Sequence, residues 1–207
     1  MVLMKNDNAL LPLKKNAKVA LIGEMARTPR YQGAGSSVIN PIKLDNALDT
    51  MKEMGIDLTF SEGYVLKGKN KKPDELIAAA VAKAKEAEVA VVFVGLTDEY
   101  ETEGNDRKHL AIPPVHNKLV EEVLKANPNT VVVLSGGASV EMPWADKVPA
   151  ILNMFLTGQA GGSAVCDILF GAVNPSGKLS ETYPLALEDN SSYNYFPGTQ
   201  VSVEYRE

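Results

Sequence analysis

Runs of apolar residues alternate along this chain with segments whose apolar residues recur every three or four positions. The longest run, residues 89–95 (Val-Ala-Val-Val-Phe-Val-Gly), is apolar and rich in β-branched residues, which predicts a strand buried on both faces. Shorter runs predict strands at residues 18–23, 56–61, 130–134, 150–156 and 178–182. Helical spacing predicts helices over residues 44–54, 73–87, 115–124 and 163–170.

This alternation of strands and helices predicts an α/β fold. The expected architecture is a three-layer α/β/α sandwich with a mostly parallel, about six-stranded sheet and flavodoxin-like layers. Residues 1–16 are rich in turn-forming residues and favour an irregular lead-in rather than a strand. Residues 63–72, rich in lysine and glycine, predict a mobile connection. One domain is therefore expected over residues 1–187, followed by a polar extension over residues 188–207 that lacks a clear pattern.

Composition narrows the function classes. The 207 residues are 45% hydrophobic and 23% charged, as in an ordinary soluble globular protein. A net charge of -5 argues against a nucleic-acid partner or an anionic membrane surface. One cysteine excludes an intramolecular disulfide, and together with two histidines it makes a poor metal inventory. No apolar run reaches the about 20 residues of a membrane span. Residues 1–5 do not resemble a signal peptide, so both a cytoplasmic and a secreted location stay open.

An acidic loop follows the strand predicted at residues 89–95. In open parallel sheets, ligands bind beyond the carboxyl ends of the strands, so this loop lies where such a fold places its chemistry. General acid–base catalysis needs a carboxyl group held in a cleft, and glycosidic cleavage needs two carboxyl groups. Spacing alone leaves open whether these side chains are catalytic or only solvate the loop: Asp98, Glu99, Glu101, Glu103 and Asp106.

Other candidate motifs favour simpler interpretations. The glycine-rich segments 33–37 and 158–162 lack a complete dinucleotide or phosphate-loop pattern, so tight turns and close packing explain them better. Ser135 and Ser163 lack the elbow motif of a serine hydrolase. Cys166 lies in an apolar helical pattern and is expected to be a small core residue.

His109 and His116 flank a Pro-Pro pair at the start of a predicted helix. The simplest expectation for both is a surface or loop position, without a role in catalysis.

Several separated motifs resemble those of family 3 glycoside hydrolases, the β-glucosidase family. Residues 101–107 (Glu-Thr-Glu-Gly-Asn-Asp-Arg) resemble its acid/base loop, and residues 3–13 resemble the start of its second domain. Its most distinctive signature in that domain is matched by residues 158–164, 167–171 and 174–179. The motifs Phe196-Pro-Gly and Val203-Glu-Tyr-Arg-Glu extend the resemblance to nearly the whole chain.

The resemblance implies a sandwich domain that packs beside a catalytic (β/α)8-type barrel. In this family the nucleophile is an aspartate on the barrel, and in many members a glutamate on the second domain is the general acid/base. Carried over by motif, that glutamate is Glu103, with Glu101 as its nearest rival. No metal or organic cofactor is implied.

Neighbouring residues take lesser roles by the same resemblance. Asn105 stands where many relatives have an aromatic residue, which leaves sugar stacking at this position in doubt. Asp106 and Arg107 resemble loop-ordering residues. Three further residues belong to a loop that matches one at the rim of the family's active site, and with Asn105 they are candidate substrate contacts: Arg30, Ser36 and Ser37.

The expected function is therefore that of the acid/base-bearing second domain of a retaining, β-glucosidase-like hydrolase of terminal β-D-glycosidic bonds. The expected partners are a β-glucoside or oligosaccharide substrate and a barrel domain, which no segment of this chain resembles. The chain is then expected to be an incomplete fragment, inactive alone, whose extension leads to a missing segment. Alternatives are a non-catalytic carbohydrate-binding or structural domain and, less favoured, a flavodoxin-like small-ligand binder.

Overall fold

The computed structural model describes residues 1–68 and 72–204, and within this part of the chain six strands form one sheet. The strand order is β1-β6-β5-β4-β2-β3. All neighbouring pairs are parallel except β1 with β6, which is antiparallel. The strands are β1 (Val2–Asn6), β2 (Val19–Ile22), β3 (Leu58–Ser61), β4 (Val89–Gly95), β5 (Thr130–Ser135) and β6 (Ala150–Asn153).

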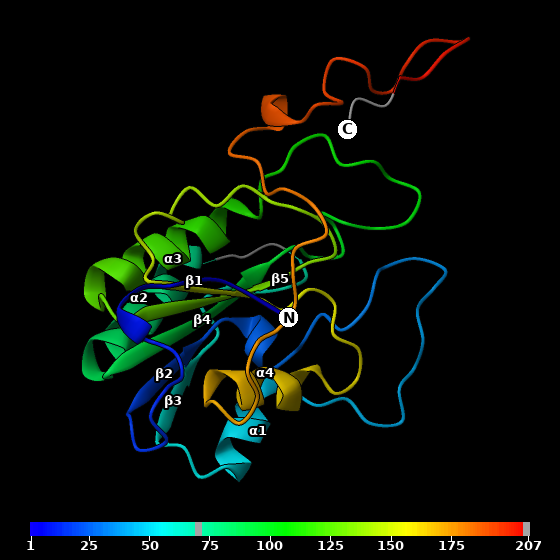
Figure 1. Ribbon diagram of the computed structural model, residues 1–207. Coiled ribbons are helices and arrows are strands. Elements are labelled where there is room, and N and C mark those ends of the chain that lie inside the picture. The colour runs from blue at the N-terminus through cyan, green and yellow to red at the C-terminus, as the bar shows by residue number, and fades with distance from the viewer. Residues whose placement is uncertain (69–71, 205–207) are drawn as a thin grey trace.

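Helices cover both faces of the sheet. Helices α2 (Pro73–Glu86) and α3 (Pro114–Ala126) lie on one face, and α1 (Ala47–Glu53) and α4 (Gly161–Leu169) lie on the other (Figure 1). Short 3-10 helices occur at Asp7–Ala9, Glu24–Ala26 and Leu187–Asp189. The predicted three-layer α/β/α sandwich with a mostly parallel sheet is therefore confirmed.

Two local predictions were wrong, although the number of strands was right. The N-terminal segment forms β1, whereas residues 178–182, all of them described, form no strand. Strand β1 lies at the edge of the sheet and buries only Val2 fully, so its sequence lacks the continuous apolar run of a central strand. The mobility expected for residues 63–72 falls partly on residues 69–71, which lie outside the described residues.

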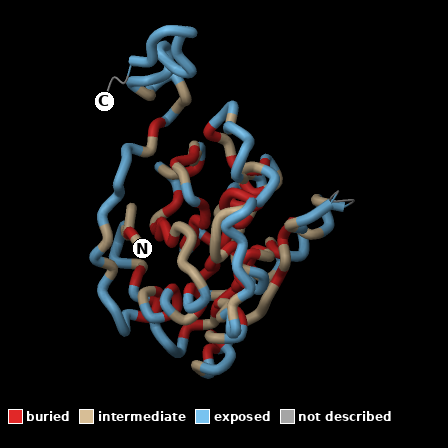
Figure 2. Tube along the Cα trace, turned by 90° about the vertical axis from the view of Figure 1, so that its right-hand side faces the viewer, coloured by how far each residue is buried: buried red, intermediate tan, exposed pale blue. Residues whose placement is uncertain are grey.

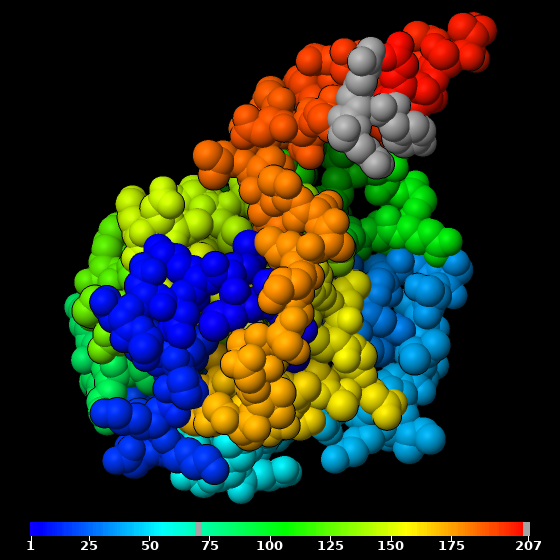
Figure 3. Space-filling view, viewed as in Figure 1, coloured from blue at the N-terminus to red at the C-terminus, as the bar shows by residue number. Residues whose placement is uncertain are grey.

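The core lies between the sheet and its helices, and the exposed segments lie at the periphery (Figure 2). Every residue of β4 and β5 is buried, as the uninterrupted apolar runs predicted. Beyond Asp189 the chain extends away from the sandwich (Figures 1 and 3), and residues 191–204 are all exposed. Residues 205–207, which complete the extension expected from the sequence, lie outside the described part.

Gly95 at the end of β4 allows a close approach to β5, and we expect its replacement by alanine to destabilise the domain strongly. Its φ is +156°, and a Cβ atom there would lie 1.7 Å from the Ser135 carbonyl oxygen. Gly95→Ala should therefore lower the free energy of unfolding by about 4 kcal/mol, as severe core strain does. Gly55→Ala is the control, because φ there is +73° with no atom within 4 Å, and should cost about 1 kcal/mol. Urea unfolding of both variants measures the difference; equal losses would contradict the close approach.

Candidate active site

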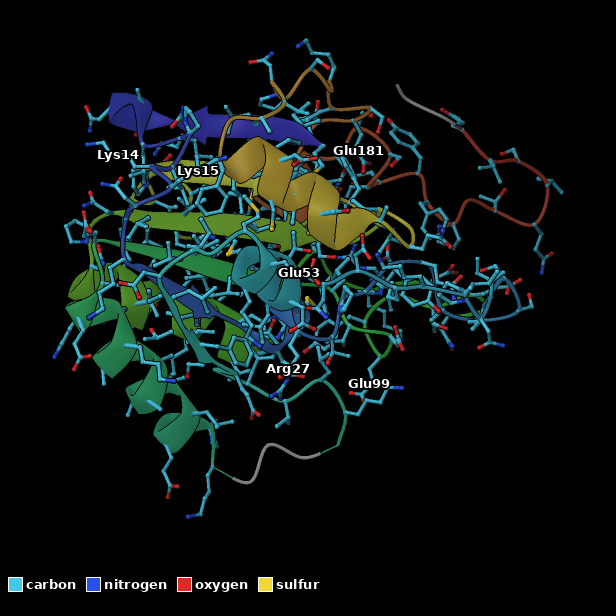
Figure 4. The ribbon with its side chains drawn as sticks, turned by 90° about the horizontal axis from the view of Figure 1, so that it is seen from below. Lys14, Lys15, Arg27, Glu53, Glu99 and Glu181 are labelled. Atoms are coloured by element: carbon cyan, nitrogen blue, oxygen red, sulfur yellow. The ribbon has the colours of Figure 1, made fainter. Side chains whose placement is uncertain are left out.

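The acidic loop lies at the carboxyl ends of the parallel strands, as expected. The loops that follow β2, β4 and β5 all extend from this end of the sheet, which includes the switch point between β2 and β4, where the chain connections diverge. In Figure 4, Glu99 and Glu181 lie toward this end, and Lys14 and Lys15, which precede β2, lie toward the other. Figure 3 shows the acidic loop in green directly beside the loop after β2 in blue.

A tight turn exposes Glu103. Thr102 and Asn105 form an isolated antiparallel bridge, and Gly104 between them has a φ of +81°. A type II turn requires a positive φ at its third residue, which explains why a glycine follows Glu103. The turn places Glu103 near its tip, where the side chain is exposed.

The loop after β2 holds the Glu103 carboxylate from one side. The Ser36 hydroxyl donates a hydrogen bond to Oε2, and the Ser36 N–H donates to the same atom at 2.7 Å. The Glu103 N–H donates in return to the Ala34 carbonyl oxygen at 3.0 Å. A Cβ on Gly35 would lie 2.5 Å from the Glu103 Cβ, so only glycine allows this approach. The hydroxyl bond first, and then the N–H bond, hold the pKa of the Glu103 carboxyl below its usual range.

Glu101, the rival candidate, has a different environment. Its carboxylate pairs with the Arg30 guanidinium and accepts a hydrogen bond from the Gly137 N–H at 2.9 Å. The Arg30 side chain is only 6% exposed and that of Glu101 is 21% exposed. A guanidinium buried to this degree must be paired, so Glu101 serves as its counter-ion.

The remaining predicted residues divide into exposed and partly buried groups. Ser37, Asn105 and Asp106 are exposed, and within the described residues Asp106 makes no side-chain hydrogen bond or ion pair. Arg107 is half-buried and donates a hydrogen bond to the Ser139 carbonyl oxygen at 3.0 Å. Burial lowers the pKa of the Arg107 guanidinium. Arg107 therefore joins the acidic loop to the loop after β5, whereas Asp106 shows no such link.

Sequence reasoning missed three features of this region. Gly137 contacts Glu101 so closely that a Cβ there would lie 2.8 Å from its Oε1. A Gly-Gly pair directly after a buried strand was the available signal for this contact. No feature of the sequence indicated that Arg30 fixes the acidic loop, because Arg30 and its partner Glu101 are 71 positions apart. A cavity of about 540 Å³ beside the acidic loop was also not expected, and its lining includes Met25, Val38 and Leu66.

The histidine expectation was half right. His109 is exposed, but His116 is 1% exposed, in helix α3. Its Nδ1 lies 3.0 Å from the Gly95 carbonyl oxygen, and its ring centroid lies 3.9 Å from that of Tyr64.

Cys166 is buried, as predicted, and burial raises the pKa of its thiol to about 12, which makes it a poor nucleophile.

Among the described residues of this loop, Glu103 is an exposed carboxylate held by hydrogen bonds from the loop after β2. The Glu101 carboxylate is paired with the Arg30 guanidinium. No group of three or more metal-ligating side chains occurs in the described part of the chain. None of the described helices has the length and apolar character needed to cross a bilayer.

Comparison with known proteins gives the family. The model of the glycosyl hydrolase family 3 C-terminal domain matches residues 1–207. The chain belongs to this family. Thermostable beta-glucosidase B of Acetivibrio thermocellus is 51% identical over 210 residues, which cover all of this chain and 28% of that protein. An exo-α-(1→6)-L-arabinopyranosidase of Bifidobacterium breve is 44% identical over 216 residues, with the same two coverages.

Solved structures agree with this assignment. The crystal structure of a GH3 beta-glucosidase from Bifidobacterium adolescentis matches 96% of this family 3 domain with a TM-score of 0.90 and 46% identity. The match covers 29% of that protein. The domain thus spans less than a third of the length of these relatives, and its fold is that of their C-terminal domain.

Proposed function

We propose that this family 3 domain supplies the general acid/base of a retaining β-glucosidase-like enzyme, and that Glu103 is that residue. One observation carries the choice of Glu103: it is the exposed carboxylate at the tip of a glycine-dependent turn, whereas Glu101 is the counter-ion of a buried arginine. A general acid must reach a substrate oxygen, and the exposed Glu103 side chain can do so, whereas the Glu101 carboxylate is engaged by Arg30.

Glu103 would act twice in each turnover. It first protonates the departing glycosidic oxygen, while a nucleophile on a separate barrel domain attacks the sugar. It then deprotonates the water that hydrolyses the glycosyl-enzyme. The Ser36 hydrogen bonds favour the carboxylate, which suits the second step. The first step needs a protonated carboxyl, and a nearby negative nucleophile together with desolvation by the barrel would raise the Glu103 pKa toward the working pH.

The proposed substrates are terminal β-glucosides or oligosaccharides. The names of the relatives support a glycoside, since they include beta-glucosidases and an arabinopyranosidase. Ser37 and Asn105 are exposed near Glu103 and are the proposed sugar contacts, whereas Arg30 is buried in its pair with Glu101. We divide the chain into a sandwich over residues 1–187 and an extension over residues 188–207. In this proposal neither part carries the nucleophile, which lies on the barrel domain of the enzyme.

The first test separates the domain from its partner. We define the two-domain enzyme as thermostable beta-glucosidase B with this chain in place of its matched segment. The isolated chain should not hydrolyse an aryl β-glucoside, and the two-domain enzyme should, because a retaining reaction needs two carboxyl groups about 5–5.5 Å apart. Steady-state rates of both, at equal concentrations, measure the contrast. Hydrolysis by the isolated chain would place both catalytic groups within these residues and overturn the two-domain proposal.

A further inference from the structure

The acidic loop is held at its base by one buried guanidinium. Arg30 Nη1 donates a hydrogen bond to the Leu96 carbonyl oxygen at 3.2 Å, and Nη2 donates to the Glu101 carbonyl oxygen at 2.8 Å. Nη1 also pairs with the Glu101 carboxylate, and Nε lies 3.5 Å from Oδ1 of Asp98. The Arg30 side chain therefore contacts both ends of the segment formed by the first six residues of the loop, Leu96 at one end and Glu101 at the other.

Glu101 extends this contact to a third loop. Its Oε2 accepts the Gly137 N–H, so the loops after β2, β4 and β5 meet at one carboxylate. The turn that carries Glu103 begins at the next residue, Thr102. The position of the Glu101 backbone thus determines where the turn starts.

The loop after β2 contacts the acidic loop a second time, near the tip of the turn. Ser36 and Ala34 bind Glu103 there, six and four residues beyond Arg30. The contact at the tip is exposed, whereas at the base the Arg30 side chain is 6% exposed and the Glu101 side chain 21%, so water competes less for the contact at the base. The less exposed contact, at the base, is the one suited to keep the turn in place during a reaction.

We infer that Arg30 and Glu101 are a positioning pair that fixes the base of the Glu103 turn and so sets where the acid/base carboxylate lies. Neither residue touches the substrate in this account. The inference rests on the proposed role of Glu103 and adds two residues whose effect on catalysis passes through it. A misplacement of about 1 Å is enough to lower a rate about 100-fold.

The test uses Arg30→Lys and Glu101→Gln in the two-domain enzyme. Lysine keeps the charge but lacks the planar fork that reaches the Leu96 oxygen, the Glu101 oxygen and the carboxylate together. Glutamine keeps an acceptor for the Gly137 N–H but removes the charge that pairs with Arg30. Arg27→Lys is the matched control, because Arg27 lies in the same loop, is 45% exposed and pairs with Glu24 and Glu62 instead.

The measurement is kcat/KM for a phenyl β-glucoside, which needs its leaving group protonated, and for a dinitrophenyl β-glucoside, which does not. Each variant should lose about 10- to 100-fold on the phenyl substrate and less than about 3-fold on the dinitrophenyl substrate, with Arg27→Lys unchanged on both. The double variant should lose no more than the worse single variant, since the two residues act as a unit.

Each other outcome decides against the inference. Equal losses on both substrates, together with a lower melting temperature, would show that the pair only stabilises the fold. Unchanged activity would show that the turn keeps its position without the pair. Glu103→Ala, measured alongside, separates this inference from the proposal beneath it: if that variant loses no leaving-group-dependent activity, the role of Glu103 itself fails.

Discussion

Replacing Glu103 with alanine in the two-domain enzyme is expected to lower kcat/KM for a phenyl β-glucoside by about 100- to 10,000-fold, the usual contribution of general acid catalysis. The same variant should lose far less on a dinitrophenyl β-glucoside, whose leaving group departs without a proton. Azide should then raise kcat for that substrate, because it attacks the glycosyl-enzyme without a general base and releases the sugar as the glycosyl azide. Steady-state kinetics on the two substrates, with and without azide, measure all three effects.

Two controls make this result specific to Glu103. Glu99→Gln changes an exposed carboxylate of the same loop and should leave both substrates unaffected. Glu103→Gln keeps the size of the side chain and its bonding to Ser36 but cannot exchange a proton, so it should be as impaired as the alanine variant on the phenyl substrate. Near-normal turnover of Glu103→Gln would favour the alternative of a structural or carbohydrate-binding domain.

The layers and most elements of this fold could be predicted from sequence because central parallel strands are buried on both faces. The run Val89–Gly95 is apolar at every position for that reason. β1 was missed because an edge strand is specified by backbone pairing, here with β6, rather than by continuous burial. The helix start expected near Leu44 falls at Ala47, because the Asn46 side chain accepts the Asp49 N–H and caps the helix there.

The candidate site was predictable only as far as its motif. The Glu-Gly pair indicated Glu103, and the turn explains the glycine that follows it. The choice between Glu101 and Glu103 could not be made from spacing, because the two residues lie only two positions apart in the loop after the same strand. It depends on Arg30, which comes from a distant loop and provides Glu101 with a buried counter-ion. Burial and charge pairing between distant residues are set by tertiary structure, which a local motif does not encode.

His116 should make the stability of this domain depend on pH between about pH 6.5 and pH 3. Its burial lowers its pKa from an ordinary 6.5 to about 3, while the hydrogen bond with Gly95 opposes the shift. The folded state therefore holds the imidazole neutral in a range where the unfolded chain binds a proton. Stability from this group is fully present above the unfolded pKa and falls as the pH drops toward the folded pKa. At about 1.4 kcal/mol per pKa unit, the complete loss approaches about 5 kcal/mol.

The measurement is the free energy of urea unfolding at several pH values for the parent chain, His116→Leu and His109→Gln. His116→Leu removes the titrating group and should show a flatter profile above about pH 5, where ordinary carboxylates of both states remain ionised. His109→Gln, which changes the exposed histidine, is the matched control for the loss of an imidazole. His116→Leu will also lower the stability at neutral pH, since the ring packs on Tyr64, so the slope and not the absolute value is compared. Parallel profiles for the parent chain and His116→Leu would mean that His116 is protonated without unfolding, and that its site at the end of β4 opens to water.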